Sequence, residues 1–263
     1  MTTLKNKTIW ITGASSGIGE ALVQLLSKEE VNLIISARRV SELERVKLAN
    51  EQKAKIEILP LDLEKSEELK SKADQAISFF GHVDILINNG GVSQRSMALD
   101  TELAIDRKIM DINYFGTIAL TRAIVPHMLT RGSGQIAIVT SLTGKFGTPW
   151  RSGYAASKHA LHGFFDSMRA ELEDKGVKFT LLAPGFIGTK LSQVALKGDG
   201  SPNGSVDETH KRGIPPEVCA QKMLKAIKKE KREVYIGKEA YAVYVKRFFP
   251  GIFAKLIKTA KVR

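Results

Sequence analysis

Short apolar runs alternate along the chain with longer amphipathic stretches. The apolar runs lie at residues 8–12, 32–36, 56–60, 84–88, 135–140, 178–183 and 233–237. Stretches of helical length separate most of them, at 17–28, 41–53, 64–80 and 102–131. Short, almost wholly apolar strands that alternate with helices are typical of a parallel sheet covered by helices on both faces. The pattern therefore predicts the α/β fold class.

One segment departs from this pattern. Residues 196–216 are polar and contain several glycines and prolines, and a loop of this length is usually either functional or disordered. We expect residues 186–216 to form an excursion or lid that shapes a substrate site. Because no linker separates the elements, the chain reads as one domain, 1–237, followed by an extension, 238–263.

Composition narrows the class of protein. The chain has 263 residues, 43% hydrophobic and 26% charged, which is typical of a globular protein with a substantial core. Its single cysteine, Cys219, cannot form an internal disulfide, which favours a reducing, cytoplasmic setting. No apolar run reaches the length of a signal peptide or a membrane span.

The net charge of +12 could attract nucleic acid or anionic lipid. An anionic cofactor combined with ordinary surface lysines would account for the same excess. Because the lysines are spread along the chain, we favour this second explanation for most of the charge and expect no nucleic-acid partner.

The first strand runs directly into TGASSGIG, residues 12–19, and then into a helix. The glycines Gly13, Gly17 and Gly19 allow a tight turn, close approach of a phosphate and close helix–sheet packing. The helix N-terminus supplies free N–H groups and a partial positive charge for a pyrophosphate. A glycine turn alone can be purely structural, but its place between the first strand and the first helix favours a dinucleotide site.

The second strand ends in ISARR, where folds that prefer NAD usually carry an acidic residue for the ribose hydroxyls. Here Ala37 stands in that place, and Arg38 and Arg39 follow it. A guanidinium group matches a 2′-phosphate well, so the prediction is NADP(H). The alternative is two solvated arginines at the start of a surface helix.

The stretch YAASK places Tyr154 four residues before Lys158, so that on a helix the two side chains share one face. A phenol titrates near pH ~10, and a neighbouring cation lowers its pKa. The pair is therefore either an acid/base device or two surface neighbours.

Two polar residues stand where function would place them. Ser141 follows the strand at 135–140, at the edge of the sheet where open α/β folds bind ligands, although a serine can also simply close a strand. Asn113 lies inside a long helical stretch, where asparagine is unfavourable because its amide competes with backbone hydrogen bonds. It marks either a functional position or a helix kink.

Taken together, the motifs resemble the short-chain dehydrogenase/reductase family in its compact, NADP-dependent branch, over about residues 5–237. The matching pieces, in family order and spacing, are TGASSGIG, NNGG at 88–91, Asn113, Ser141, YAASK and PGFIGT at 184–189. The resemblance implies a single-domain, doubly wound (Rossmann) fold with seven parallel strands, assembled as a homodimer or homotetramer. One departure is Gly90, where the family more often has alanine, and we expect it to do little harm.

The resemblance also implies the catalytic roles. Tyr154 would move a proton to a carbonyl or from an alcohol, and Ser141 would bind the substrate oxygen. Lys158 would lower the tyrosine pKa and hold the nicotinamide ribose, and Asn113 would hold a water that links Lys158 to solvent. No metal is needed, because the two hydroxyls polarise the carbonyl.

By the same resemblance, three strand ends would hold NADP(H). Asp62 would meet the adenine amino group, and the segment beginning at Pro184 would touch the nicotinamide carboxamide, although Asp62 and Asn89 could instead be turn formers. The expected cofactor contacts are Gly13, Ser15, Ser16, Gly17, Ile18, Gly19, Arg38, Arg39, Asp62, Leu63, Asn89, Gly90, Gly91, Tyr154, Lys158, Pro184, Gly185, Ile187 and Thr189.

The extension after residue 237 mixes aromatic, aliphatic and basic residues. Pro250 should divide it into two short helices. Three interpretations stay open: a peripheral membrane contact, a lid over the substrate cleft, and a patch that packs against another subunit. It is similar to the tail of the hydroxysteroid-dehydrogenase-like branch, as is NNGGVSQRS.

The sequence therefore predicts an NADP(H)-dependent oxidoreductase that interconverts a carbonyl and a secondary alcohol on a small hydrophobic molecule. Phe146 and Trp150 predict an apolar wall of its substrate site. One alternative is a catalytically silent, cofactor-binding regulatory protein, for which a broken Tyr/Lys pair would be typical. Another is a membrane-associated or nucleic-acid scaffold, which would need clustered basic residues, and only the tail offers these.

Overall fold

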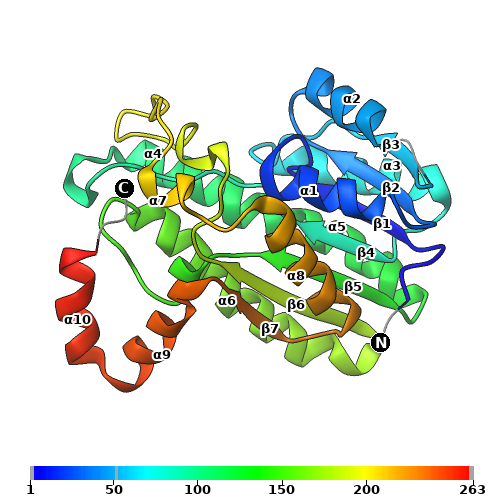
Figure 1. Cartoon of the computed structure of the whole chain (residues 1–263). Helices are drawn as coiled ribbons and strands as arrows, with labels where there is room; N and C mark the ends of the chain where they lie inside the picture. The colour runs from blue at the N-terminus through cyan, green and yellow to red at the C-terminus, as the bar shows by residue number, and fades with distance from the viewer. Residues whose placement is uncertain (1–2, 51–52, 261–263) are drawn as a thin grey trace.

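In the computed structural model of the chain, which describes residues 3–50 and 53–260, seven parallel strands form one twisted sheet in the order β3-β2-β1-β4-β5-β6-β7 (Figure 1). Each apolar run singled out above forms one of these strands, so the predicted fold class is confirmed. The strands are β1 (Thr8–Thr12), β2 (Asn32–Ser36), β3 (Lys55–Ile58), β4 (Ile85–Asn88), β5 (Gly134–Val139), β6 (Val177–Pro184) and β7 (Glu233–Ile236).

Helices cover both faces of the sheet because successive strand residues point to opposite sides. In β2, Leu33 and Ile35 join the core under α1, α2 and α8, whereas Ile34 joins the core under α3, α5 and α6. The helices are α1 (Gly17–Leu26), α2 (Val40–Ala49), α3 (Leu69–Phe80), α4 (Leu103–Met110), α5 (Gly116–Thr130), α6 (Ser152–Leu172), α7 (Glu208–Lys211), α8 (Pro216–Lys228), α9 (Tyr241–Phe248) and α10 (Pro250–Thr259).

Two predicted helical stretches are interrupted. In 64–80 a single 3₁₀ turn at Ser66–Glu68 precedes α3. In 102–131 a π-helical turn at Asp111–Phe115 joins α4 to α5. Such bulges often mark functional positions, and this one carries Asn113. The stretch 41–53 ends as α2 at Ala49, and its residues 51–52 lie outside the described part.

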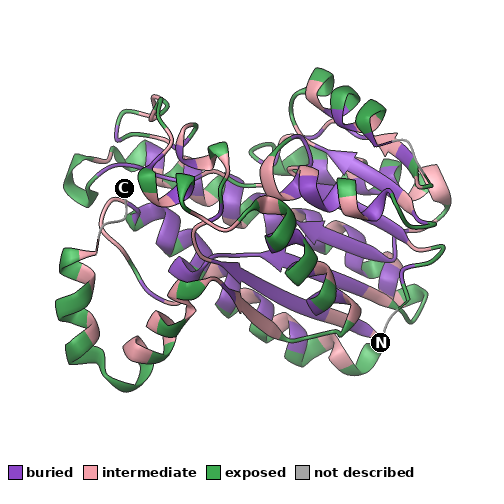
Figure 2. Cartoon of the chain, viewed as in Figure 1, coloured by how far each residue is buried: buried purple, intermediate pink, exposed green. Residues whose placement is uncertain are grey.

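The strand order reverses between β1 and β4, which opens a crevice at the carboxyl ends of these strands. The excursion that carries α7 and the tail helices α9 and α10 stand around this end of the sheet (Figure 1). The predicted division of the tail at Pro250 is confirmed, and residues 261–263 of the extension lie outside the described part. The five inner strands are almost wholly buried, whereas the edge strands β3 and β7 are only partly buried and the tail helices are largely exposed (Figure 2).

Candidate active site

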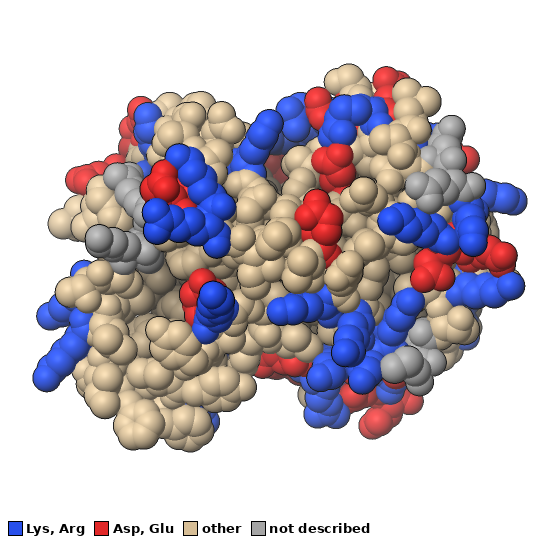
Figure 3. All heavy atoms as spheres, in the orientation of Figure 1, with Lys and Arg blue, Asp and Glu red and all other residues tan. Residues whose placement is uncertain are grey.

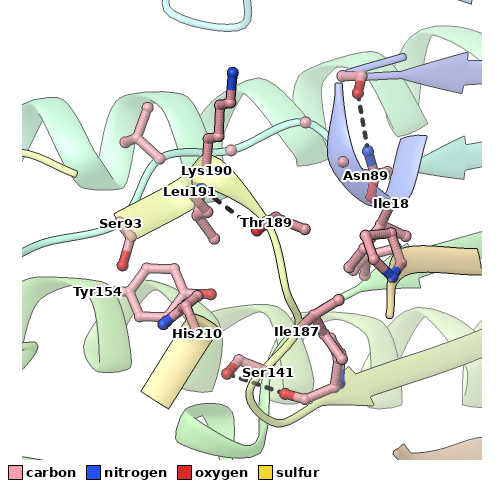
Figure 4. Close-up of a pocket in the computed structure, with 18 of the residues that line it drawn as sticks. Ile18, Asn89, Ser93, Ser141, Tyr154, Ile187, Thr189, Lys190, Leu191 and His210 are labelled. Atoms are coloured by element: carbon pink, nitrogen blue, oxygen red, sulfur yellow. Dashed lines mark hydrogen bonds between the residues drawn. The ribbon is translucent and has the colours of Figure 1, made fainter. Parts of the chain in front are cut away.

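One large cleft, with a volume of about 1380 Å³, runs across the carboxyl ends of the strands. Its walls come from the turn after β1, the loops after β2, β4, β5 and β6, and the tail helices. Figure 4 shows Tyr154, Ser141 and His210 on one side of this cleft and Ile18 and Asn89 on the other. All of the predicted site residues line the cleft except Gly19 and Asn113.

The turn between β1 and α1 fits a dinucleotide phosphate. Gly13 and Gly17 have φ angles of 64° and 57°, in a region that L-residues with a side chain rarely adopt. A Cβ on Gly13 would lie 2.8 Å from the Gly90 Cα, so only glycine allows this approach. The side chain of Ser16 does not cap α1, which leaves the first N–H groups of the helix available for an anion.

Side chains tie this turn to the end of β4. The Asn89 amide nitrogen donates to the carbonyl oxygens of Thr12 and Gly13 at 3.1 and 3.2 Å, and the Thr12 hydroxyl accepts from the backbone nitrogen of Gly90 at 2.9 Å. A Cβ on Gly90 would lie 2.7 Å from a Leu63 methyl group. The glycine therefore lets Leu63 fill the space that the more usual alanine would take.

Gly19 lies behind the turn rather than in the cleft. A Cβ there would overlap the Gly13 carbonyl group, so its smallness permits close packing of α1 against the turn, as one of the predicted glycine roles requires. The prediction of a direct cofactor contact for Gly19 is not supported by the position of the residue.

Basic side chains surround the cleft where β2 ends. Arg38 and Arg39 are exposed and line this end. The pKa of Glu42 is lowered, first by its hydrogen bond to Arg45 and further by the charges of Arg39 and Lys190. Lys190 therefore approaches the same corner from the loop after β6. The sequence analysis did not single it out, although a lysine directly after the PGFIGT segment was a usable signal.

Three side chains meet at the centre of the cleft. Tyr154, on the first turn of α6, is 9% exposed, and its hydroxyl is hydrogen-bonded to the Ser141 side chain. The Ser141 hydroxyl in turn accepts from the Thr143 hydroxyl at 2.9 Å and donates to the Pro184 carbonyl oxygen at 3.4 Å (Figure 4). The two hydroxyls are thus held side by side at the end of β5, where one carbonyl oxygen could meet both.

Lys158 lies one helical turn beyond the tyrosine. Its Nζ is 5.7 Å from the Tyr154 ring centroid and donates to the Val139 carbonyl oxygen at 3.0 Å. Burial lowers the pKa of Lys158 to about 8. The geometry therefore brings together the residues that the YAASK motif predicts.

The pKa of Tyr154 lies above its usual value. Burial raises it, and this effect outweighs the opposing influence of the Ser141 hydrogen bond and of the positive charges on Arg151 and Arg95. For the chain alone, desolvation of the phenolate outweighs the influences that lower the tyrosine pKa, and the lowering expected from Lys158 stays a prediction. The phenol is in its protonated form at neutral pH, ready to donate.

Asn113 is fully buried in the π-helical turn and does not line the cleft. Its Oδ1 accepts from the Val92 backbone nitrogen at 2.8 Å, and its Nδ2 donates to the Val92 carbonyl oxygen at 2.9 Å and to the Ser157 hydroxyl at 3.0 Å. The side chain therefore ties the loop after β4 to α6, next to Lys158. Its predicted role in holding a water stays a prediction.

The substrate end of the cleft has apolar and cationic walls. Phe146 lines it as predicted, but Trp150 is not among the described lining residues, so that prediction is wrong. At Trp150 the backbone turns through a φ of 69°, and the next residue, Arg151, reaches the cleft instead. Arg95 and His210 also line it; the sequence analysis missed all three because they lie in loops without regular periodicity.

The tail helices complete this end. Tyr241, Val245 and Phe253 line the cleft, and the Phe253 ring lies 5.3 Å from that of Phe146. The Lys246 Nζ donates to the Lys145 carbonyl oxygen at 2.9 Å. The inner face of the tail is therefore a wall of the site, whereas its outer face is exposed.

Comparisons with known proteins agree with this geometry. A family model described as "short chain dehydrogenase" matches residues 7–199. The "Dehydrogenase/reductase SDR family protein 7-like" of Drosophila melanogaster is 39% identical over 257 residues, which cover 95% of this chain and 79% of that protein. The human "Dehydrogenase/reductase SDR family member 7" is 38% identical over 257 residues, covering 94% and 75% of the two chains.

A solved structure gives the same result. A short-chain dehydrogenase from Streptomyces avermitilis superposes with a TM-score of 0.82 at 26% identity, covering 98% of this chain and 97% of that one. The family model spans more than half of the chain, and the fold and the residues at the cleft agree with it. The chain therefore belongs to the short-chain dehydrogenase/reductase family of oxidoreductases.

Proposed function

We propose that the protein is an NADP(H)-dependent oxidoreductase that interconverts a carbonyl and a secondary alcohol on a small hydrophobic molecule. The observation that supports this most is the convergence of Tyr154, Ser141 and Lys158 in one cleft with the glycine turn. A disrupted Tyr/Lys pair would be typical of the cofactor-binding regulatory alternative. Here both residues of the pair are present, and the tyrosine hydroxyl is hydrogen-bonded to Ser141.

The proposed mechanism assigns the proton to the chain. When bound, the nicotinamide would supply or accept the hydride. Ser141 binds the substrate oxygen and stabilises the negative charge that develops on it. Tyr154, which is protonated at neutral pH, donates its proton to that oxygen during reduction and becomes a phenolate; in the oxidation direction this phenolate accepts the proton of the alcohol. Lys158 stabilises the resulting phenolate, and Asn113 is proposed to position the lysine through α6.

NADP(H) is proposed over NAD(H) because of the charges at the end of β2. Ala37 carries no carboxylate to bind the ribose hydroxyls, and Arg38 and Arg39 are exposed beside it. Lys190 adds a further cation at this corner. Guanidinium and ammonium groups compensate the two negative charges of a 2′-phosphate.

The substrate is proposed to be hydrophobic because apolar side chains wall the cleft beyond Tyr154. These walls include Leu142, Phe146, Phe186, Leu191, Val194, Leu196, Val245, Phe253, Leu256 and Ile257. Burying apolar surface against such walls favours apolar ligands by about 25 cal/mol for each Å². Excursion residues 186–216 are proposed to act as the lid of this site.

The test is a panel of aliphatic, aromatic and polycyclic ketones assayed for NADPH consumption, with NADH in parallel. The proposal expects turnover of at least one apolar ketone and a higher kcat/KM with NADPH than with NADH. Binding of NADPH without turnover of any ketone or matching alcohol would favour the regulatory alternative. Equal efficiency with both cofactors would contradict the NADP(H) assignment.

We also propose that the outer face of the tail contacts an anionic membrane surface. Residues 240–260 contain no acidic residue. Figure 3 shows a broad uncharged surface over the tail helices with basic side chains at its outer edge. The exposed apolar residues of the tail that do not line the cleft are Tyr244, Phe248, Phe249 and Ile252. None of the helices within residues 3–50 and 53–260 is long and apolar enough to cross a bilayer.

Co-sedimentation with phosphatidylserine-containing and purely zwitterionic vesicles tests the membrane contact. The proposal expects binding to the anionic vesicles at low salt and weaker binding as salt rises. Replacing Phe248 and Phe249 with serine should weaken it, whereas Leu99→Ser, at a residue 99% exposed elsewhere, should not. Absence of binding at low salt would refute this proposal and leave the oxidoreductase proposal untouched. Formation of a homodimer or homotetramer stays a prediction, which light scattering would measure.

A further inference from the structure

A buried cluster of charged side chains adjoins Tyr154 on the substrate side of the cleft. The Arg95 Nε lies 2.6 Å from the Asp207 Oδ2, and both side chains are almost completely buried. The Arg151 Nη2 and the His210 Nδ1 each lie 3.8 Å from the same carboxylate oxygen. The cluster joins three segments: the loop after β4, the residue before α6, and the excursion that leads into α7.

The cluster carries more positive than negative charge. Burial lowers the pKa of Arg151 to about 10 and that of His210 to about 4, so at neutral pH the arginine is charged and the histidine is neutral. Within residues 3–50 and 53–260, two cations of this cluster therefore face the one carboxylate of Asp207. The Arg95 Nη2 is buried without a hydrogen-bond partner among the described residues, which leaves part of its charge uncompensated.

Both arginines and Tyr154 line the same cleft, and the Arg151 guanidinium lies over the Phe186 ring, 5.3 Å from its centroid. Arg151 precedes Tyr154 by three residues, and its backbone carbonyl accepts from the Ala155 nitrogen at the start of α6. An isolated bridge pairs Arg151 with Ser96, next to Arg95. Both guanidinium groups favour ionisation of the Tyr154 phenol. Because these groups are buried, water screens the interaction weakly.

The other charged groups around Tyr154 come from four elements. Lys158 on α6 is hydrogen-bonded to the Val139 carbonyl oxygen. Asp106 on α4 packs against Gly153, where a Cβ would overlap its carboxyl group. Burial raises the pKa of this carboxyl, which favours its neutral form. Glu239, after β7, lines the cleft beside Gly185. His210 of α7 completes the set.

We propose that Arg95 and Arg151 are positioning residues that hold a net positive charge beside the Tyr154 hydroxyl, and that Asp207 of the excursion sets the size of this charge. The proton equilibrium of the proton donor then depends on the excursion being seated. This inference rests on the proposed function of Tyr154 as the proton donor. It adds the positive charges of Arg95 and Arg151 to that of Lys158, the cation of the YAASK motif.

Two substitutions that each remove one charge should act in opposite directions. Asp207→Asn removes the opposing negative charge and should lower the pH at which reduction activity falls by about one unit, whereas Arg151→Gln should raise it by about one unit. Reduction requires the protonated phenol, so kcat/KM falls as pH rises through the tyrosine pKa. Arg151→Lys keeps the charge and should restore the profile.

Matched controls separate charge from stability. Asp199→Asn lies in the same excursion but is exposed, and Arg212→Gln removes an exposed arginine after α7. Neither should move the profile. If the cluster is purely structural, Asp207→Asn and Arg151→Gln should both lower thermal stability and kcat, but they should not shift the pH profile in opposite directions. Shifts that are absent, or that have the same sign in both variants, would overturn the proposal.

A readout without turnover separates this inference from the proposed function. In protein labelled with ¹³Cζ-tyrosine, the resonance that Tyr154→Phe removes reports the ionisation of this phenol directly. The proposal expects its titration to move down in Asp207→Asn and up in Arg151→Gln, even if no ketone is reduced. If no ketone is reduced but these shifts are present, the proposed enzymatic function is refuted and the electrostatic coupling stands. If the titration of the resonance is unchanged in both variants, the electrostatic coupling is refuted and the proposed enzymatic function stands.

Discussion

The two halves of the cleft are built in different ways. The cofactor half uses strand ends and the turn that follows β1, and its walls come from contiguous motifs such as residues 12–19. The substrate half is assembled from segments that lie far apart in the chain, including the loop after β4, the excursion before α8 and the tail helices. Backbone geometry defines the first half, and side chains in irregular segments define the second.

This difference shows where the chain can vary. The cofactor turn has little freedom, because a Cβ at Gly13 would strike the backbone of Gly90. The substrate half is held by side-chain contacts, such as the Arg95–Asp207 pair and the Phe146–Phe253 stack. Substitutions there should change the substrate without loss of the cofactor. Tyr154 and Lys158 lie at the boundary and serve both halves.

The largest effect should come from Tyr154→Phe, at this boundary. Loss of the proton donor should reduce kcat by about 100- to 10,000-fold, whereas the affinity for NADPH should change little. Stopped-flow or steady-state assays give the rate, and fluorescence titration gives the affinity. Tyr244→Phe, at an exposed tail residue that does not line the cleft, is the matched control. Near-normal turnover in Tyr154→Phe would mean that Tyr154 is not the proton donor at the boundary of the two halves.

Lys158, whose loss should also lower the rate, should show the boundary in stability as well. Its pKa falls from 10.5 to about 8 in the fold, so between these values the unfolded chain binds more protons and stability rises with pH. Below pH 8 the buried charge costs about 3 kcal/mol. Lys158→Met should therefore raise the melting temperature at pH 7, and its advantage over the wild type should shrink towards pH 10.

Thermal melts of the cofactor-free protein at several pH values measure this effect. The exposed Lys222→Met is the control and should show no such pH dependence. A Lys158→Met protein that is less stable than the wild type at pH 7 would show that the bond to the Val139 carbonyl oxygen outweighs the cost of burying the charge.

Arg38→Ala should affect the cofactor half alone. Loss of one charge-assisted bond to a 2′-phosphate should lower kcat/KM for NADPH by about 10- to 100-fold, and efficiency with NADH should change little. Lys197→Ala removes an exposed charge from the excursion instead and should leave both values unchanged. An equal loss with NADPH and NADH would place Arg38 outside the 2′-phosphate site.

Phe253→Ala should affect the substrate half alone, and by the smallest amount. Removing the ring that packs on Phe146 should raise KM for apolar ketones by about 3- to 10-fold, without a change in KM for NADPH. Phe248→Ala, on the exposed side of the tail, is the control. A changed KM for the cofactor in Phe253→Ala would contradict the separation of the two halves.

The strands were predictable because each is a short apolar run, and burial on both faces demands such runs. The ends of the helices were less so: the π-helical turn at Asp111–Phe115 leaves no periodic signal. Trp150 was assigned to the wrong surface, since a left-handed backbone at this residue sends Arg151 to the cleft in its place. No pattern of hydrophobic positions predicts a left-handed backbone at that residue.

By itself, the sequence determined the fold class, the glycine turn and the spacing of Tyr154 and Lys158, because hydrophobic period and short motifs are local properties of the chain. Tertiary structure alone decided the charge around the phenol. Burial raises the pKa of Tyr154, and two arginines oppose this rise: Arg95, which a distant loop brings near, and Arg151, three residues before the tyrosine. Desolvation and Coulomb interaction depend on which groups are neighbours in space, and such neighbours exist only once the chain has folded.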